Sequence, residues 1–222
     1  MKKKHILCTL LLAAWLAPAI SAQPEPKEWL KVERIYKKDA EKYREFVENY
    51  GDAKTNYTMI VHADSSWGSY YWTFVKEEKQ PGQHDQPSVH NLYADIVLED
   101  HGGTLPIASF KDFGNEVYWP EFLYPYCIVD DADHDGTPEF YLTYFGASDG
   151  LDAKPLKVIV YSTEHRIHAK YIKSKVTAYY PAGNEDDRYH VEYDTSWKKL
   201  PKPIADRAME LVREVKRKGL VE

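Results

Sequence analysis

The chain has 222 residues, of which 43% are hydrophobic and 29% are charged, and its formal net charge is −6. This acidic balance argues against nucleic acid as a partner, because phosphate binding requires a basic surface. The length is more than a small disulfide-stapled fold needs and suits one domain with a sizeable core.

The first 22 residues have the pattern of a secretory signal peptide. Three lysines follow Met1, an apolar run extends from Ile6 to Ala17, and small residues lead to a cleavage point after Ser21 or Ala22. The apolar run is too short to span a bilayer comfortably, and no second long apolar segment follows. We therefore expect an exported protein, periplasmic or extracellular, whose mature chain of residues 23–222 has no transmembrane segment.

Without this leader, 26 basic and 35 acidic residues remain, and the net charge is about −9. Cys127 is the only cysteine of the mature chain, so no internal disulfide can form even in an oxidising compartment. Its apolar neighbours predict a buried strand thiol, and no cysteine-enzyme signature surrounds it.

The mature chain begins with an ambiguous segment and a helix. Trp29 to Tyr36 has apolar residues at positions that suit either a strand or a helix. Asp39 to Tyr50 favours a helix, with apolar residues on one face and Gly51 after its end. Strands are expected next at residues 57–62 and 70–75, with a turn at 64–66. Residues 76–89 are polar and predict a long loop that is either disordered or functional.

The rest of the chain predicts more strands and a final helix. His101-Gly102-Gly103 indicates a hairpin turn between the first two of these strands, and the last two can pair with each other. The expected strands cover residues 92–98, 104–110, 122–129, 139–145, 155–162, 167–172, 177–180 and 189–193. Apolar residues at spacings of three and four predict a helix over 203–218.

These elements predict an α+β fold that is mostly β, with antiparallel sheets and a helix near each end of the mature chain. We expect residues 23–222 to form a single β-rich domain. No second copy of the acidic motif described next occurs in the chain, which argues against a repeat architecture such as a propeller.

The sharpest chemical signal is an acidic loop between two expected strands. Asp131, Asp133 and Asp135 alternate, Gly136 follows, and Glu139 begins the next strand. Carboxylates at loop positions one, three and five with a glycine at six are the pattern of a calcium loop. Asp130 adds a further negative charge, and no lysine or arginine interrupts the run, so the loop repels itself unless a cation neutralises it.

This loop does not fit a helix-loop-helix EF-hand. An EF-hand carries a bidentate acid at position twelve, where this chain has Leu142 within a strand pattern. An acidic β-turn is the alternative, but turn geometry alone rarely demands three acids at strict alternation. Zinc is disfavoured, because His134 is expected to point away from ligands at odd positions. The ion's role is expected to be structural, tying two strands together.

The loop resembles the Asp-x-Asp-x-Asp-Gly-x-x-acid calcium loop that lies between strands in integrin-type and related secreted β-domains. The resemblance implies that the side chains of Asp131, Asp133 and Asp135, the Thr137 carbonyl and Glu139 bind calcium. Aspartate is usual at the last of these positions, which makes Glu139 a departure from the pattern. A second acidic turn, residues 148–152, is separated from the loop by a strand of about 23 Å, so it cannot share the same ion, and we read it as a hairpin turn.

A broader resemblance covers about a third of the chain, from Leu92 to Tyr161. It rests on the segments 110–113 (Phe-Lys-Asp-Phe), 128–139 with the acidic loop, and 155–161 (Pro-Leu-Lys-Val-Ile-Val-Tyr). These segments resemble a family of exported bacterial proteins labelled as surface polysaccharide biosynthesis proteins, which implies a place in the cell envelope. The chain departs from that family at residues 146–149, where a cysteine is usual, so a shared disulfide is not expected.

The combined reading is an exported, calcium-binding, β-rich envelope protein, more of a binding protein than an enzyme, whose partner is a glycan or a protein. Two alternatives stay open: a periplasmic polysaccharide hydrolase, and an inhibitor or immunity protein whose acidic surface covers a basic enzyme. A hydrolase requires two suitably spaced carboxylates, and nothing in the sequence selects a pair. Clustered aromatic residues, such as those at 67–72, fit strand packing better than a sugar-stacking surface.

Overall fold

The computed structural model describes residues 30–82, 87–150, 153–163, 170–181 and 188–220. The expected signal peptide, residues 1–22, lies outside the described residues, as does the first half of the expected strand 167–172. Of the described half, only Ile172 lies in a strand. Within the described part, no helix has the length and apolar character needed to cross a membrane.

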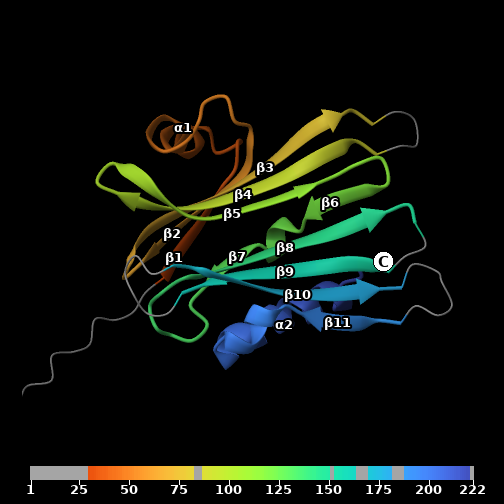
Figure 1. Ribbon diagram of the computed structural model, residues 1–222. Helices are drawn as coiled ribbons and strands as arrows, with labels where there is room; N and C mark the ends of the chain where they lie inside the picture. Colours follow the sequence, from red (N-terminus) through yellow and green to blue (C-terminus); the bar gives the residue numbers. More distant parts are fainter. Residues whose placement is uncertain (1–29, 83–86, 151–152, 164–169, 182–187, 221–222) are drawn as a thin grey trace, which may run out of the picture.

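The described chain is mostly β and forms two antiparallel sheets (Figure 1). The first sheet has the order β1-β2-β3-β4-β5, and the second has the order β11-β10-β9-β8-β6, with β7 also paired to β8. The strands are β1 (Leu30–Ile35), β2 (Tyr57–Ser65), β3 (Gly68–Gln80), β4 (Val89–Asp100), β5 (Gly103–Phe113), β6 (Tyr118–Phe122), β7 (Ile128–Asp130), β8 (Glu139–Ser148), β9 (Lys154–Ser162), β10 (Ile172–Tyr180) and β11 (His190–Tyr193). The helices are α1 (Ala40–Asn49) and α2 (Lys202–Arg217), and the 3-10 turns are η1 (Tyr124–Tyr126) and η2 (Thr195–Lys199).

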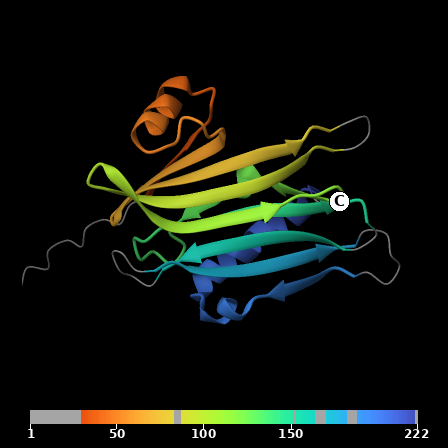
Figure 2. The same cartoon turned by 45° about the horizontal axis from the view of Figure 1, so that its top comes forward.

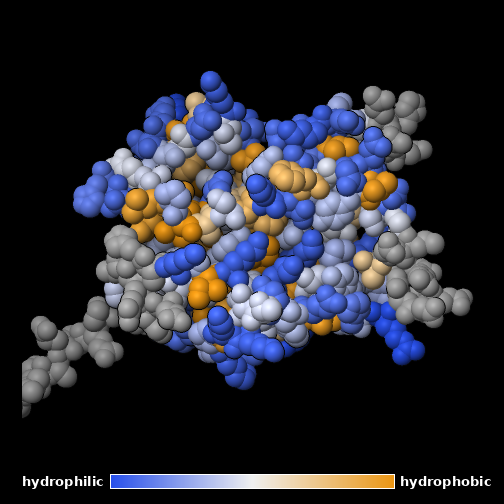
Figure 3. All heavy atoms as spheres, in the orientation of Figure 1, coloured by the Kyte–Doolittle hydropathy of each residue, from blue (hydrophilic) through white to orange (hydrophobic). Residues whose placement is uncertain are grey.

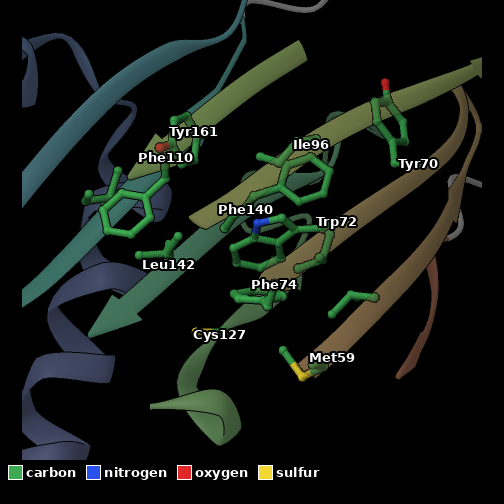
Figure 4. Close-up of a cluster of buried hydrophobic side chains, with 14 of the residues drawn as sticks. Met59, Tyr70, Trp72, Phe74, Ile96, Phe110, Cys127, Phe140, Leu142 and Tyr161 are labelled. Atoms are coloured by element: carbon green, nitrogen blue, oxygen red, sulfur yellow. The ribbon is translucent and has the colours of Figure 1, made fainter. Parts of the chain in front are cut away.

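The two sheets pack face to face around a large aromatic core. Trp72 of β3 meets Phe140 of β8 edge-to-face, with ring centroids 5.6 Å apart, and its neighbour Phe74 lies 4.5 Å away (Figure 4). Edge-to-face geometry is favourable because the positive ring edge meets the negative ring face. The aromatic cluster at 67–72 therefore contributes Tyr70 and Trp72 to packing, as the sequence reading favoured.

A helix covers the outer face of each sheet. Phe46 of α1 packs against Tyr57 and Ile60 on the outside of the first sheet. The five apolar residues that predicted the C-terminal helix are the buried residues of α2. They pack on the outside of the second sheet and are Ile204, Ala208, Leu211, Val212 and Val215. The order of layers is thus helix, sheet, sheet, helix (Figures 1 and 2).

Strand β8 contributes to both cores because both of its faces are covered. Phe140, Leu142 and Tyr144 point into the core between the sheets, whereas Tyr141 and Phe145 pack in the cluster of α2. This is the alternation predicted for the segment after the acidic loop.

Turn chemistry sets the predicted hairpin of β4 and β5. Asp100 pairs with Gly103, which leaves a two-residue loop of His101 and Gly102. Both have positive φ, 49° and 82°, as a type I′ turn requires, and glycine takes this conformation without a steric penalty.

Two expectations were wrong in detail. The loop predicted at 76–89 is shorter, because β3 continues to Gln80 and β4 starts at Val89. Polar residues can occupy these strand ends, because the backbone of β3 stays paired with β4 from Lys76 opposite Leu92 to Gln80 opposite Val89. The single strand predicted at 122–129 is instead the end of β6, the turn η1 and the start of β7, because Pro125 favours a turn.

Phe140→Ala should lower the free energy of unfolding by about 3–5 kcal/mol, because it empties a fully buried aromatic site between the sheets. Urea unfolding followed by fluorescence measures this loss. Phe113→Ala is the matched control, since Phe113 is 53% exposed, and its effect should stay within about 0.5 kcal/mol. Equal losses in the two variants would contradict this account of the core.

Candidate metal centre

The acidic loop is closed at its base by a strand pair. Asp130 of β7 lies opposite Glu139 of β8, and Val129 lies opposite Phe140. Residues 131–138 form the loop between these strands, so the segment is a β-hairpin connection and not a helix-loop-helix unit. The exclusion of an EF-hand is thereby confirmed.

Backbone geometry turns the loop inward on its own carboxylates. His134 and Gly136 have φ of 62° and 83°, so two residues with left-handed backbone conformation lie within three positions of the loop. The Asp131 carboxylate accepts hydrogen bonds from the backbone N–H groups of Asp135 and Gly136, at 3.0 and 3.1 Å. Thr137 N–H donates to Asp135 Oδ1 at 2.6 Å. These bonds hold the side chains inside the loop.

Four carboxylates converge at this point. One oxygen from each of Asp131, Asp133, Asp135 and Glu139 lies within 4.8 Å of the others. The structure therefore brings together all four acidic residues that the sequence pattern predicted as metal ligands. Such a group can hold a metal ion, and the arrangement by itself does not identify the ion.

Glu139 has the most unusual environment of the four. The residue is only 1% exposed, and its Oε2 accepts a hydrogen bond from Ala132 N–H at 2.9 Å. Burial raises the pKa of its carboxyl from an ordinary 4.5 to about 9. The Ala132 hydrogen bond opposes this rise, and the negative charges of Asp133, Asp135 and Asp131 add to it.

Thr137 lies in the same loop and is 3% exposed. Its Oγ1 is buried and makes no hydrogen bond within the described part of the chain. A buried hydroxyl without a partner carries a desolvation cost. Calcium binding by the Thr137 carbonyl stays a prediction.

The donor set fits a hard cation. All the converging groups are carboxylate oxygens, which calcium and magnesium prefer, whereas zinc sites usually include histidine or cysteine. His134 is exposed and does not belong to the cluster, in line with the expectation that it points away.

A partner of the loop that the sequence did not reveal comes from α2. Arg207 donates to Asp130 Oδ2 at 2.8 Å and to Glu210 at 2.6 Å. Asp130 thus has a cationic partner of its own and stands outside the converging group. Because 77 residues separate Arg207 from Asp130, no local pattern could indicate this pair.

The other candidates of the sequence reading lie elsewhere. Asp149, in the second acidic turn, is exposed just beyond the far end of β8, and residues 151–152 of that turn are outside the described residues. Cys127 is fully buried between η1 and β7 rather than within a strand, and its Sγ donates to Thr143 O at 3.3 Å. Burial raises the pKa of this thiol to about 12, which leaves it protonated and unreactive.

No family model, curated protein or solved structure matches this chain.

The pair of Asp130 and Arg207 should couple the loop to α2. A double-mutant cycle of Asp130→Asn and Arg207→Gln compares the loss of unfolding free energy in the double variant with the sum of the losses in the two single variants. These should differ by roughly 0.5–1 kcal/mol, the contribution of a partly exposed ion pair. Urea unfolding of the four proteins measures the coupling. Strict additivity would show that the contact contributes nothing.

Glu139 should make the metal-free protein less stable as the pH rises. The folded state keeps a proton on Glu139 up to about pH 9, whereas the unfolded chain releases it near 4.5, so unfolding releases a proton between these values. The unfolding free energy should therefore fall by up to about 1.4 kcal/mol per pH unit within this window. Thermal melts in chelator from pH 5 to 8.5 test this sign. Glu139→Gln should flatten the dependence, and an unchanged slope in that variant would refute the assignment.

Proposed function

We propose that this chain is an exported, calcium-binding envelope protein of the α+β class, with α1 and α2 toward the ends of its mature chain, and that it acts by binding a glycan or a protein. The observation that carries the calcium part is the convergence of four carboxylates within 4.8 Å at the closure of a β-hairpin. Export and an envelope location rest on the leader pattern and on the resemblance described from the sequence.

Calcium is favoured over the other hard cation, magnesium. Calcium accepts six to eight oxygen ligands in irregular geometry, whereas magnesium demands a near-octahedral shell and keeps several waters. Four protein carboxylates on one short loop provide more charge and more ligand oxygens than the one or two carboxylates typical of a magnesium site.

The role proposed for the ion is structural. Asp130 and Glu139 are cross-strand partners, so an ion held by this loop ties the start of β8 to the end of β7. It also offsets the repulsion among four acids, one of which is almost completely buried. Because β8 contributes to both cores, an ion at its first residue stabilises the middle of the molecule.

Calcium should raise the melting temperature of the purified mature protein relative to the same protein in chelator. At a hundredfold excess over the dissociation constant the gain is about 2.7 kcal/mol, or roughly 5–10 °C for a chain of this size. Differential scanning calorimetry with calcium, magnesium or chelator measures the shift, and magnesium should give a smaller one.

Two variants separate specific binding from a general charge effect. Asp133→Asn should abolish the calcium shift, because it removes one of the converging carboxylates. Asp149→Asn removes the same charge from an exposed position just beyond the other end of β8 and should leave the shift unchanged. If neither calcium nor chelator moves the melting temperature of the parent protein, the calcium proposal fails.

A further inference from the structure

A row of lysines occupies the face of the second sheet that is turned toward the first sheet. Lys157 of β9 lies two residues from Ile159, whose side chain belongs to the core between the sheets, so both point to the same face. On β10, Lys175 lies opposite Ile159 and Lys173 lies opposite Tyr161, another residue of that core. Cross-strand partners share a face, so all three lysines stand on it.

At β10, this face of the second sheet extends beyond the core between the two sheets. No residue of β10 belongs to the core between the sheets, although Phe110 of β5 reaches its margin with Lys173 Nζ 6.0 Å from the ring centroid. Figure 2 shows β5 running beside β9 and β10, with α2 on the far side of the sheet. Figure 3, in the orientation of Figure 1, shows hydrophilic and hydrophobic residues mixed over that side of the molecule.

The lysines are close enough to repel one another. Residues two apart on a strand are separated by about 6.6 Å, and diagonal neighbours across strands by about 7–8 Å. Partial burial lowers the pKa of Lys157 and of Lys173, and the charge of Lys175 lowers both further. A row of like charges that raises its own electrostatic energy is complementary to an anion.

The carboxylates around the row neutralise only part of it. Asp112 lies 3.6 Å from Lys157 Nζ. Glu192 of β11 lies opposite Thr177 on the same face, where it interacts with Tyr179 and lies 3.8 Å from His190 Nε2. Asp194 acts on Lys173 at longer range, while its side chain accepts a hydrogen bond from Trp197 N–H. Among the described residues, Lys173 and Lys175 have no carboxylate within 4.0 Å.

An aromatic residue, Tyr179, follows the lysines on the same face of β10. Tyr179, four residues after Lys175, stacks on His190 with ring centroids 4.7 Å apart and planes inclined by 12°. Thr177, between Lys175 and Tyr179, faces the same side but is only 3% exposed, so its hydroxyl is not available to a ligand. Cations followed by an aromatic ring along one strand match the carboxylates and rings of acidic sugars.

We propose that the lysine row Lys157, Lys173 and Lys175, extended by Tyr179, binds a carboxylate-bearing polysaccharide. Small-molecule sites are concave, whereas this row stands on an open sheet face and suits a chain with repeated charges. A long polyphosphate also carries repeated charges, but it has no sugar ring to contact Tyr179. This inference deepens the proposed binding function by naming its ligand class, and it does not depend on the ion.

The probe is hyaluronate, a polysaccharide with one carboxylate in each disaccharide, titrated into the mature protein by calorimetry at 50 mM salt. Binding should weaken at 200 mM salt, because ionic contacts release counterions. Neutral dextran should not bind. Polyglutamate, which carries charge without sugar rings, should bind at least fivefold more weakly than hyaluronate. Equal binding of polyglutamate, or no binding of hyaluronate, overturns the proposal.

Variants locate the site. Lys173→Gln with Lys175→Gln should weaken hyaluronate binding at least tenfold, and Tyr179→Leu should weaken it severalfold. The matched control is Lys37→Gln with Lys38→Gln, which removes two adjacent exposed lysines before α1 and should change binding less than twofold. The row variant should melt no lower than the parent, since repulsion is relieved. A tenfold loss in the control as well would overturn the location.

Titrations repeated in chelator separate this inference from the calcium proposal. Hyaluronate binding that persists in chelator at a temperature below the melting point supports a lysine site independent of the ion. Binding that disappears in chelator, with the protein still folded, overturns the lysine row as the site even if calcium raises the melting temperature.

Discussion

The mutual repulsion of the carboxylates in loop 131–138 is the constraint around which this part of the molecule is organised. Asp131 and Asp135 are held close by backbone N–H groups of their own loop, and Glu139 is held by Ala132. These hydrogen bonds offset part of the repulsion, but they do so with neutral dipoles. Burial makes a negative charge on the Glu139 carboxyl costly, and this desolvation raises the pKa of the carboxyl to about 9.

The position of this loop connects it to both hydrophobic cores and to α2. It leads directly into β8, whose side chains alternate between the core of the two sheets and the cluster beneath α2. Arg207 of α2 adds a direct contact to Asp130, on the other side of the loop. The start of β8 is therefore joined to both cores and to a helix that is distant in sequence.

Three lysines also lie close together, on strands β9 and β10 of the second sheet. Lys157 is placed among aromatic rings and Asp112, with Tyr144 at 4.9 Å from its ammonium group. The ring face and the carboxylate together compensate a cation that burial disfavours. Lys173 and Lys175 have no carboxylate within 4.0 Å among the described residues, and the anionic ligand that we propose would supply the missing countercharge.

The amino-acid sequence by itself determined the features that depend on neighbouring residues: the strand alternation after the loop, the apolar stripe of α2, the turn at Gly102 and the identity of the four converging acids. Each follows from a short-range rule of side-chain period, turn geometry or ligand spacing. Only the tertiary structure decided the extension of β3 and β4 into polar residues, the contact of Arg207 with Asp130 and the lysine row across β9 and β10. These depend on which strands pair, in which register, and on which helix covers which face, and no local pattern of residues contains that information.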